Sequence, residues 1–249
     1  MTSGVPAFST FLIWNYHKVL EIASLSGPSQ SRDTIDLTSH DSVGSFKEYV
    51  ASVIDGGEIS IEGNFIKGDA NGQIKFHTDL QAGTKRSCFI VMPMAVGGAW
   101  SFEAIASGFE TAYPYEEKIG VSGTLKVTGK PVLLTTQSAG MTGLTGHEYD
   151  AAVEEAALSI TPAIAVGTYA YVCEVTDSDR DGVKLVVTAA SHTIYAQGIE
   201  EDSGVETPVV IPLGAAGTDT DILILVHETD VAVTKAPRLY TLTVTRPAA

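Results

Sequence analysis

Ser39, His40 and Asp41 follow one another in the sequence and are the three residue types of a hydrolytic triad. A triad needs its nucleophile, base and orienting carboxylate linked by hydrogen bonds of about 2.6–3.2 Å. Consecutive side chains point in different directions, and no Gly-x-Ser-x-Gly elbow surrounds this serine. We therefore predict a polar turn in which Thr38, Ser39, Asp41 and Ser42 bond nearby backbone amides, and no catalytic residue.

A second acidic group, Asp177, Asp179 and Asp181, precedes Gly182 with the spacing that opens a calcium-binding loop. The twelfth position of such a loop needs a bidentate glutamate, but here it is Thr188 within a strand-like run. We predict a hairpin turn and keep the three aspartates only as a weak calcium candidate.

No other pattern predicts a metal, cofactor or catalytic site. The remaining histidines are scattered singly, and no nucleotide-binding glycine motif occurs. The segment "GHEYD", residues 146–150, contains a histidine and two acids and is interpreted as solvated linker. The sequence therefore predicts no cofactor and no enzymatic activity.

Composition narrows the class of protein. The 249 residues are 44% hydrophobic and carry a formal net charge of −15, which disfavours binding to nucleic-acid phosphates. Cys88 and Cys173 lie in apolar, strand-like runs and are expected to be buried free thiols, consistent with synthesis in a reducing cytoplasm. No secretory signal and no apolar run of about 20 residues is present, so no membrane insertion is expected.

The elements that must position these residues are mostly strands. From Gly57 onward apolar and polar residues alternate, which indicates antiparallel sheets with one wet face. The strand candidates before residue 134 are "GEISIEGNF", "GQIKFHTDL", "CFIVMPM", "AWSFEAI" and "KIGVSGTLKVTGKP".

One helix is expected. Val43, Phe46, Val50 and Val53 are spaced by three, four and three residues, as in the apolar stripe of a helix. A capping-box pattern and a Gly-Gly pair bound this stretch, which predicts a helix over residues 46–55.

The second half predicts a separate domain. Residues 135–156 have no sustained period and are expected to form a linker. Residues 157–249 then contain short strands at even intervals, typical of a β-sandwich. These are "TYAYVCEV", "GVKLVVTA", "TIYAQGI", "TPVVIPL", "DILILVHE" and "LYTLTVTR".

Three blocks in the first half occur in a fixed order: "VLEIASLSGPSQSRDTIDLTSHDS", "DGGEISIEGNF" and "SGTLKVTGKPVLL". This order resembles the major tail (tail tube) proteins of long, non-contractile-tailed bacteriophages, the siphophages. In the second half, "LSITPAI", "VKLVVTAAS", "IPLGAAGTDTDILILVHETD" and "YTLTVTR" resemble a cadherin-like or bacterial immunoglobulin-like β-sandwich.

The chain is thus expected to be mainly β and to have four parts: an N-terminal arm (1–15), an antiparallel sandwich or barrel-type tail-tube domain with one flanking helix (16–134), the linker, and an Ig-like sandwich (157–249). The apolar residues of the arm have no amphipathic partner within it, so we expect the arm to be mobile in the isolated subunit and to order on assembly. The resemblance to tail tube proteins implies a structural virion protein, made in the host cytoplasm and located in the phage tail. Such proteins form hexameric rings that stack into a tube through which DNA passes without specific binding.

The partners implied are other copies of the chain and the tape measure, terminator and distal tail proteins, with the C-terminal domain decorating the tube exterior. Glu58 and Glu62, on the polar side of one predicted strand, are our candidates for residues that face the lumen. An alternative function stays open, that of a surface adhesion protein whose sandwich binds host envelope or carbohydrate.

Overall fold

The chain is described by a computed structural model at residues 7, 9–40, 42, 44, 46–93, 95–165, 167–229 and 234–249. It is mainly β and divides into two compact units. The first unit comprises Met1–Lys18, Ile90–Trp100 and Leu133–Ala249, and the second comprises Val19–Phe89 and Ser101–Val132.

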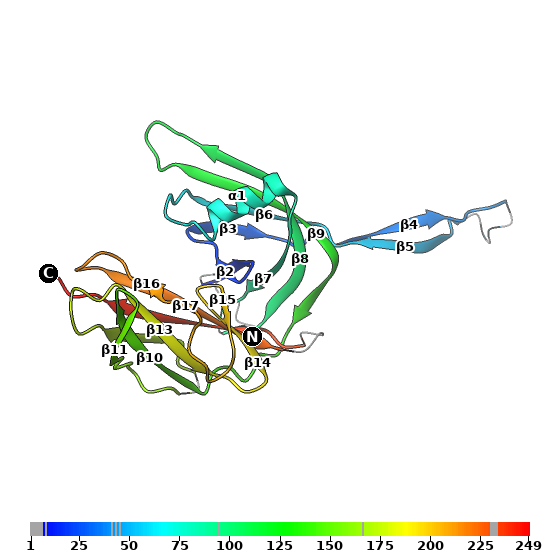
Figure 1. Ribbon diagram of the computed structural model, residues 1–249. Helices are drawn as coiled ribbons and strands as arrows, with labels where there is room; N and C mark the ends of the chain where they lie inside the picture. The colour runs from blue at the N-terminus through cyan, green and yellow to red at the C-terminus, as the bar shows by residue number, and fades with distance from the viewer. Residues whose placement is uncertain are drawn as a thin grey trace. The chain divides into compact units, whose positions relative to one another are not determined.

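A seven-stranded sheet has the order β2-β1-β7-β8-β9-β6-β3, so β2 and β3 are its outer strands. Strands β8 and β9 are long and bend strongly along their length (Figure 1). The strands are β1 (Phe11–Trp14), β2 (His17–Lys18), β3 (Ile22–Ser26), β6 (Glu58–Asn64), β7 (Lys85–Val91), β8 (Ala99–Ala112) and β9 (Gly120–Leu134).

Strand β6 confirms the predicted alternation. Ile59 and Ile61 are buried, whereas Glu58, Ser60 and Glu62 are exposed. The strand lies antiparallel to β9, which places Ile59 opposite the buried Leu125. One face of this part of the sheet is therefore core and the other is wet.

The helix is not where the sequence predicted it. Residues 46–55 do not form a helix, because Tyr49–Asp55 is strand β5. The helix α1 instead spans Gln73–Ala82, within the run "GQIKFHTDL" that was predicted to be a strand. Its buried residues are Gln73, Phe76 and Asp79, so the inward face is two-thirds polar and shows no apolar stripe in the sequence.

A buried polar knot holds the start of α1. The carboxylate of Asp69 accepts hydrogen bonds from the backbone amides of Gly72 (3.1 Å), Gln73 (2.8 Å) and Leu20 (3.1 Å). The side-chain amide of Gln73 donates to the carbonyls of Leu20 (3.0 Å) and Asn64 (2.8 Å). These hydrogen bonds satisfy helix amides that lack intrahelical partners, and they tie α1 to Leu20 before β3 and to Asn64 at the end of β6.

Part of the predicted N-terminal arm is ordered structure. Phe11–Trp14 is strand β1, in which Leu12, Ile13 and Trp14 are fully buried. Asn15 and Tyr16 both have positive φ and form the tight turn to β2, and within the first unit the ring of Tyr16 stacks on Tyr195 at 3.8 Å. Residues 1–6 and 8 lie outside the described residues.

The rest of the first unit is a two-sheet sandwich. One sheet has the order β11-β10-β13-β16 and the other β12-β18-β17-β14-β15. The strands are β10 (Gly143–Asp150), β11 (Val153–Ala157), β12 (Ala170–Glu174), β13 (Gly182–Thr188), β14 (His192–Ala196), β15 (Ile199–Glu201), β16 (Ile211–Pro212), β17 (Asp219–Glu228) and β18 (Arg238–Thr245). Residues of both sheets, including Leu144, Leu185, Ile224 and Leu242, share one hydrophobic core.

The prediction of an irregular linker over residues 135–156 is wrong for β10 and most of β11. Two inward positions of β10 are not apolar, and this hides its alternation. Gly146 lies against Leu158 and Leu185, and buried Glu148 accepts hydrogen bonds from the amide and hydroxyl of Thr176 at 2.9 and 2.6 Å. The outer limits of the four predicted parts stay a prediction.

Two further predictions concern cysteines and membrane segments. Cys88 and Cys173 are both buried thiols outside any disulfide, as expected, and burial raises the pKa of Cys173 to about 11. Among the described residues, no helix has the length and apolar character needed to cross a membrane.

Candidate functional site

The most exposed element of the second unit is a two-stranded hairpin. Strands β4 (Ser31–Asp36) and β5 (Tyr49–Asp55) pair only with each other and extend away from the neighbouring strands of their unit (Figure 1). Every residue of β4 and all but one of β5 are exposed. A lone two-stranded hairpin is only marginally stable in water, so this one lacks the support that a third strand or a packed face would give.

Apolar side chains lie on both faces of this hairpin. Ile35 lies opposite Val50 on one face, whereas Tyr49, the next residue along β5, points to the other. Phe46 and Val53 are 76% and 72% exposed. We call the following set the apolar hairpin surface: Ile35, Leu37, Phe46, Tyr49, Val50, Val53 and Ile54. A concentration of this kind on an exposed element marks an interaction site.

The base of the hairpin is fixed by polar contacts. The Ser29 hydroxyl donates to the Glu58 carbonyl and accepts from the Glu58 amide at 3.0 Å. Asp55 Oδ2 accepts a hydrogen bond from Lys126 Nζ of β9 at 2.8 Å, which holds the pKa of Asp55 below its usual value. The hairpin is thus anchored to the sheet at one end while its strands are free of it.

Ser39 and His40 lie at the tip of this hairpin, in the segment that connects β4 to β5, and the predicted α-helix over residues 46–55 does not follow them. Thr38 Oγ1 accepts a hydrogen bond from the Glu48 amide and Ser42 Oγ accepts one from the Ser39 amide, both at 3.0 Å. These contacts confirm the turn for Thr38 and Ser42. Asp41 lies outside the described residues.

Glu58 and Glu62 lie on the wet face of β6, together with Ser60. Across the antiparallel register they face Lys126 and Ser122 of β9. Glu58 Oε1 is 4.0 Å from Lys126 Nζ. This patch is a polar, mildly acidic sheet face.

The acidic segment around Asp177, Asp179 and Asp181 is not a hairpin turn. It connects β12 to β13, which belong to different sheets. Asp177 Oδ1 accepts from the Asp179 amide at 3.4 Å. The three aspartates are not part of the one group of at least three acidic, histidine or cysteine ligands that converges among the described residues.

Arg180 gives this acidic segment a structural role. Its guanidinium lies 3.3 Å from the buried carboxylate of Glu148, and also contacts Asp150 at 3.8 Å and Glu155 at 3.6 Å. The cation that stabilises the connection is therefore the arginine within the motif. The aspartates stay only a weak calcium candidate.

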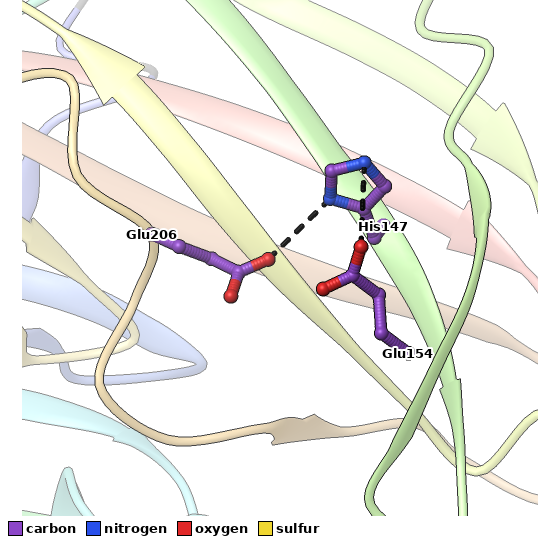
Figure 2. A group of neighbouring side chains, drawn as sticks. All are labelled: His147, Glu154 and Glu206. Atoms are coloured by element: carbon purple, nitrogen blue, oxygen red, sulfur yellow. Dashed lines mark hydrogen bonds and ion pairs between the residues drawn. The ribbon is translucent and has the colours of Figure 1, made fainter.

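The group of ligands that does converge is His147, Glu154 and Glu206 (Figure 2). One ligand atom from each residue lies within 4.8 Å of the others. His147 Nδ1 is 3.4 Å from Glu206 Oε1, and His147 Nε2 is 4.0 Å from Glu154 Oε1. A histidine nitrogen with two carboxylate oxygens is a donor set that can hold a divalent metal.

Sequence reasoning missed this group, because "GHEYD" was taken for linker. The signal that could have found it is the alternation of side chains along a strand. In β10, His147 and Tyr149 lie on one face and Gly146 and Glu148 on the other, which faces the core. Glu206 is 59 residues away from His147 and could not be assigned to the same place without the sheet pairing.

No protein-family model matches this chain, and no curated protein matches it. Among solved structures, the chain is similar to one in the virion of a native gene transfer agent particle, with a TM-score of 0.45, 14% identity, and coverage of 52% of this chain and 98% of that chain. It is similar to one in the sheath/tube terminator of the extracellular contractile injection system PVC, with a TM-score of 0.44, 15% identity, and coverage of 53% and 98%. A third similarity, to a chain in the anti-feeding prophage baseplate, has a TM-score of 0.41, 11% identity, and coverage of 53% and 97%.

Proposed function

We propose that this chain is the structural subunit of a phage tail tube, and that it assembles with copies of itself into hexameric rings that stack. The observation that carries the proposal is the apolar hairpin surface, which extends from the sheet with both faces exposed. In an isolated chain, these seven large apolar side chains stay in contact with water, which is unfavourable. Between copies of the chain they would be buried.

The open sheet favours self-association for a second reason. Its outer strand β3 (Ile22–Ser26) pairs on one side only, with β6, and an edge of this kind promotes uncontrolled aggregation unless it is covered. A ring in which each subunit continues the sheet of the next removes the edges and yields a closed barrel. The resemblance of residues 17–134 to tail tube proteins adds a sequence-based reason for the same arrangement.

The remaining parts of the proposal follow from the resemblance and from charge. The wet face with Glu58 and Glu62 would line the lumen, where a mildly acidic wall lets DNA pass without binding it. The tape measure, terminator and distal tail proteins would be the partners in the virion tail. The sandwich, predicted as an Ig-like domain over residues 157–249 and extended by β10 and β11, would decorate the exterior.

The test is the effect of the apolar hairpin surface on self-association. Phe46→Ser combined with Val53→Ser removes its two most exposed side chains without touching a buried residue. We expect the concentration at which the protein associates, measured by sedimentation velocity, to rise at least about tenfold, because burial of each side chain contributes roughly 1.5–3 kcal/mol.

The matched control is Val153→Ser combined with Val209→Ser, two valines that are 60% and 50% exposed in the sandwich unit. This control should associate like the wild type. Equal association of wild type and hairpin variant, or a wild type that stays monomeric at every concentration, would refute the proposal.

A further inference from the structure

We propose that His147, Glu154 and Glu206 form a binding site for a divalent transition-metal ion of the Zn²⁺ class. The three residues come from separate segments of the sandwich: His147 from β10, Glu154 from β11, and Glu206 from the segment after β15. An isolated bridge between Val186 and Glu206 places this segment beside β13. Sheet pairing therefore gathers the ligands, and their positions do not depend on one flexible loop.

The strand register explains why Glu154 reaches His147. Tyr149 lies directly opposite Glu154, and a register shift between His147 and Tyr149 brings one extra residue into this part of the β10–β11 pair. Such irregularities re-aim side chains and are common at functional sites. Figure 2 shows that each of the two ring nitrogens of His147 faces the carboxylate of a different glutamate.

The Tyr149 hydroxyl contacts one oxygen of each carboxylate and can donate its single proton to either, which leaves the other oxygen of each for a metal. Its hydroxyl lies 3.3 Å from Glu154 Oε2 and 3.1 Å from Glu206 Oε2. The other two oxygens, Glu154 Oε1 and Glu206 Oε1, are the ones directed at His147. A hydrogen-bond donor that fixes the ligating carboxylates from behind is the usual outer shell of a metal site.

The contacts of His147 with the two carboxylates are longer than those of a close ion pair. A charge-assisted contact between imidazolium and carboxylate would be about 2.7–2.9 Å, but the separations here are 3.4 and 4.0 Å. Zinc bonds of about 2.0–2.2 Å place tetrahedral ligands about 3.4 Å apart. The two carboxylates face different ring nitrogens, and one ion binds only one of them, so the His147 ring has to turn for one nitrogen and both oxygens to meet the ion. None of the three side chains is buried, which leaves room for this movement.

Charge and donor type define the class of ion. Lys184 Nζ is 3.5 Å from Glu206 Oε2 and offsets one of the two carboxylate charges. With a neutral imidazole the ligand set keeps one net negative charge, which favours a dication without a high affinity. A nitrogen ligand and only three protein donors suit Zn²⁺ and its neighbours, whereas Ca²⁺ and Mg²⁺ take six or more oxygen ligands.

The experiment is isothermal titration of the chelator-treated full chain with ZnCl₂, and separately with CaCl₂. We expect one Zn²⁺ per chain, no Ca²⁺ binding at the same concentrations, and loss of Zn²⁺ binding in His147→Ala. Tyr149→Phe should keep the stoichiometry but weaken binding about tenfold, because it removes only the orienting hydroxyl. Histidine side-chain NMR should show that the His147 resonances shift on Zn²⁺ addition.

The matched control is His40→Ala, which removes an exposed histidine at the hairpin tip and should bind Zn²⁺ like the wild type. Should His147→Ala reduce folded protein by circular dichroism, Glu154→Gln replaces it as the ligand variant. Absence of Zn²⁺ binding, Zn²⁺ binding that survives the ligand variant, or equal affinity for Ca²⁺ would overturn the proposal. None of these outcomes depends on ring assembly.

Discussion

Glu201 is a buried carboxylate within the sandwich of the first unit. It lies on β15 opposite the core residue Ile194, it is 5% exposed, and neither of its side-chain oxygens has a hydrogen-bond partner among the described residues. Burial disfavours the charged carboxylate and thereby raises the pKa of Glu201 from 4.5 to about 8. At neutral pH the fold therefore contains a protonated glutamic acid at this position.

This shift makes the stability of the sandwich depend on pH. Below pH 4.5 the carboxyl is protonated in both states, so it has no effect. Between pH 4.5 and 8 the unfolded chain releases a proton that the folded chain keeps, and the free energy of unfolding falls. By pH 7 the loss amounts to about 3 kcal/mol, at about 1.4 kcal/mol per pH unit.

Glu201→Gln should remove most of this pH dependence and raise the free energy of unfolding at pH 7. The measurement is urea unfolding from pH 4.5 to 8, followed by hydrogen exchange of the amides of β14 and β17. The exposed neighbour Asp202, changed to Asn, should keep the wild-type slope. A wild-type stability that is flat across this range would contradict the assignment.

Helix α1 depends on a single buried carboxylate at its start. Asp69→Ala would leave the amides of Leu20, Gly72 and Gln73 without an acceptor in a buried setting. We expect a loss of about 2–4 kcal/mol of unfolding free energy in the second unit, and faster hydrogen exchange in α1. The control is Glu116→Ala, which changes an exposed acid in the turn between β8 and β9 and should leave the free energy of unfolding unchanged. A similar loss of unfolding free energy in this control would rule out a specific role for Asp69.

Gly57 is required at the base of the hairpin, where it packs closely against the backbone of Ser29. Its φ is +81°, and a Cβ there would lie 2.0 Å from the Ser29 carbonyl oxygen. Gly129 has a similar φ of +74°, but nothing lies within 4 Å of its missing Cβ. Gly57→Ala should therefore destabilise the second unit more than Gly129→Ala, whose cost is the backbone strain of about 1 kcal/mol alone. If both variants lower the midpoint of thermal unfolding equally, the contact between residue 57 and Ser29 tolerates a side chain.

The elements were predictable where burial followed hydrophobicity. In β6 it does, and the alternation of Ile59 and Ile61 with polar residues identified the strand and its wet face. In α1 burial does not follow hydrophobicity, because two of the three inward residues are Gln73 and Asp79. In β5 the apolar residues stay exposed, so the helical spacing of Val50 and Val53 reflected no packing at all. The β-branched content of that run was the better signal.

The candidate sites were less predictable than the fold. The apolar hairpin surface exists because β4 and β5 pair only with each other and not with the seven-stranded sheet, which no local pattern in the sequence indicates. The His147, Glu154 and Glu206 group depends on the pairing of β10 with β13 and on the bridge between Val186 and Glu206, which bring Glu206 to strands far away in the sequence. In both cases tertiary contacts, which a single sequence does not reveal, determine the site.

At the scale of the assembled molecule, the proposed lumen wall makes an electrostatic prediction. Glu58→Lys combined with Glu62→Lys reverses two charges per subunit on the wet face of β6. Tubes of this variant, assembled with short duplex DNA, should retain DNA at about 50 mM salt and release it by about 200 mM, as phosphate contacts are screened.

Wild-type tubes should retain no DNA at either salt concentration. Glu116→Lys combined with Glu117→Lys makes the same charge change in the exposed turn between β8 and β9. If this control pair retains as much DNA as the wall pair, or neither pair retains any, Glu58 and Glu62 do not line the lumen.

Electron microscopy shows by direct observation whether this chain builds rings through its exposed hairpin. Negative-stain images of the full chain over a concentration series should show closed rings that stack into tubes at high concentration. The same series with Phe46→Ser and Val53→Ser should show mainly single subunits. Single subunits for the wild type at all concentrations, or unchanged tubes for the variant, would contradict the account.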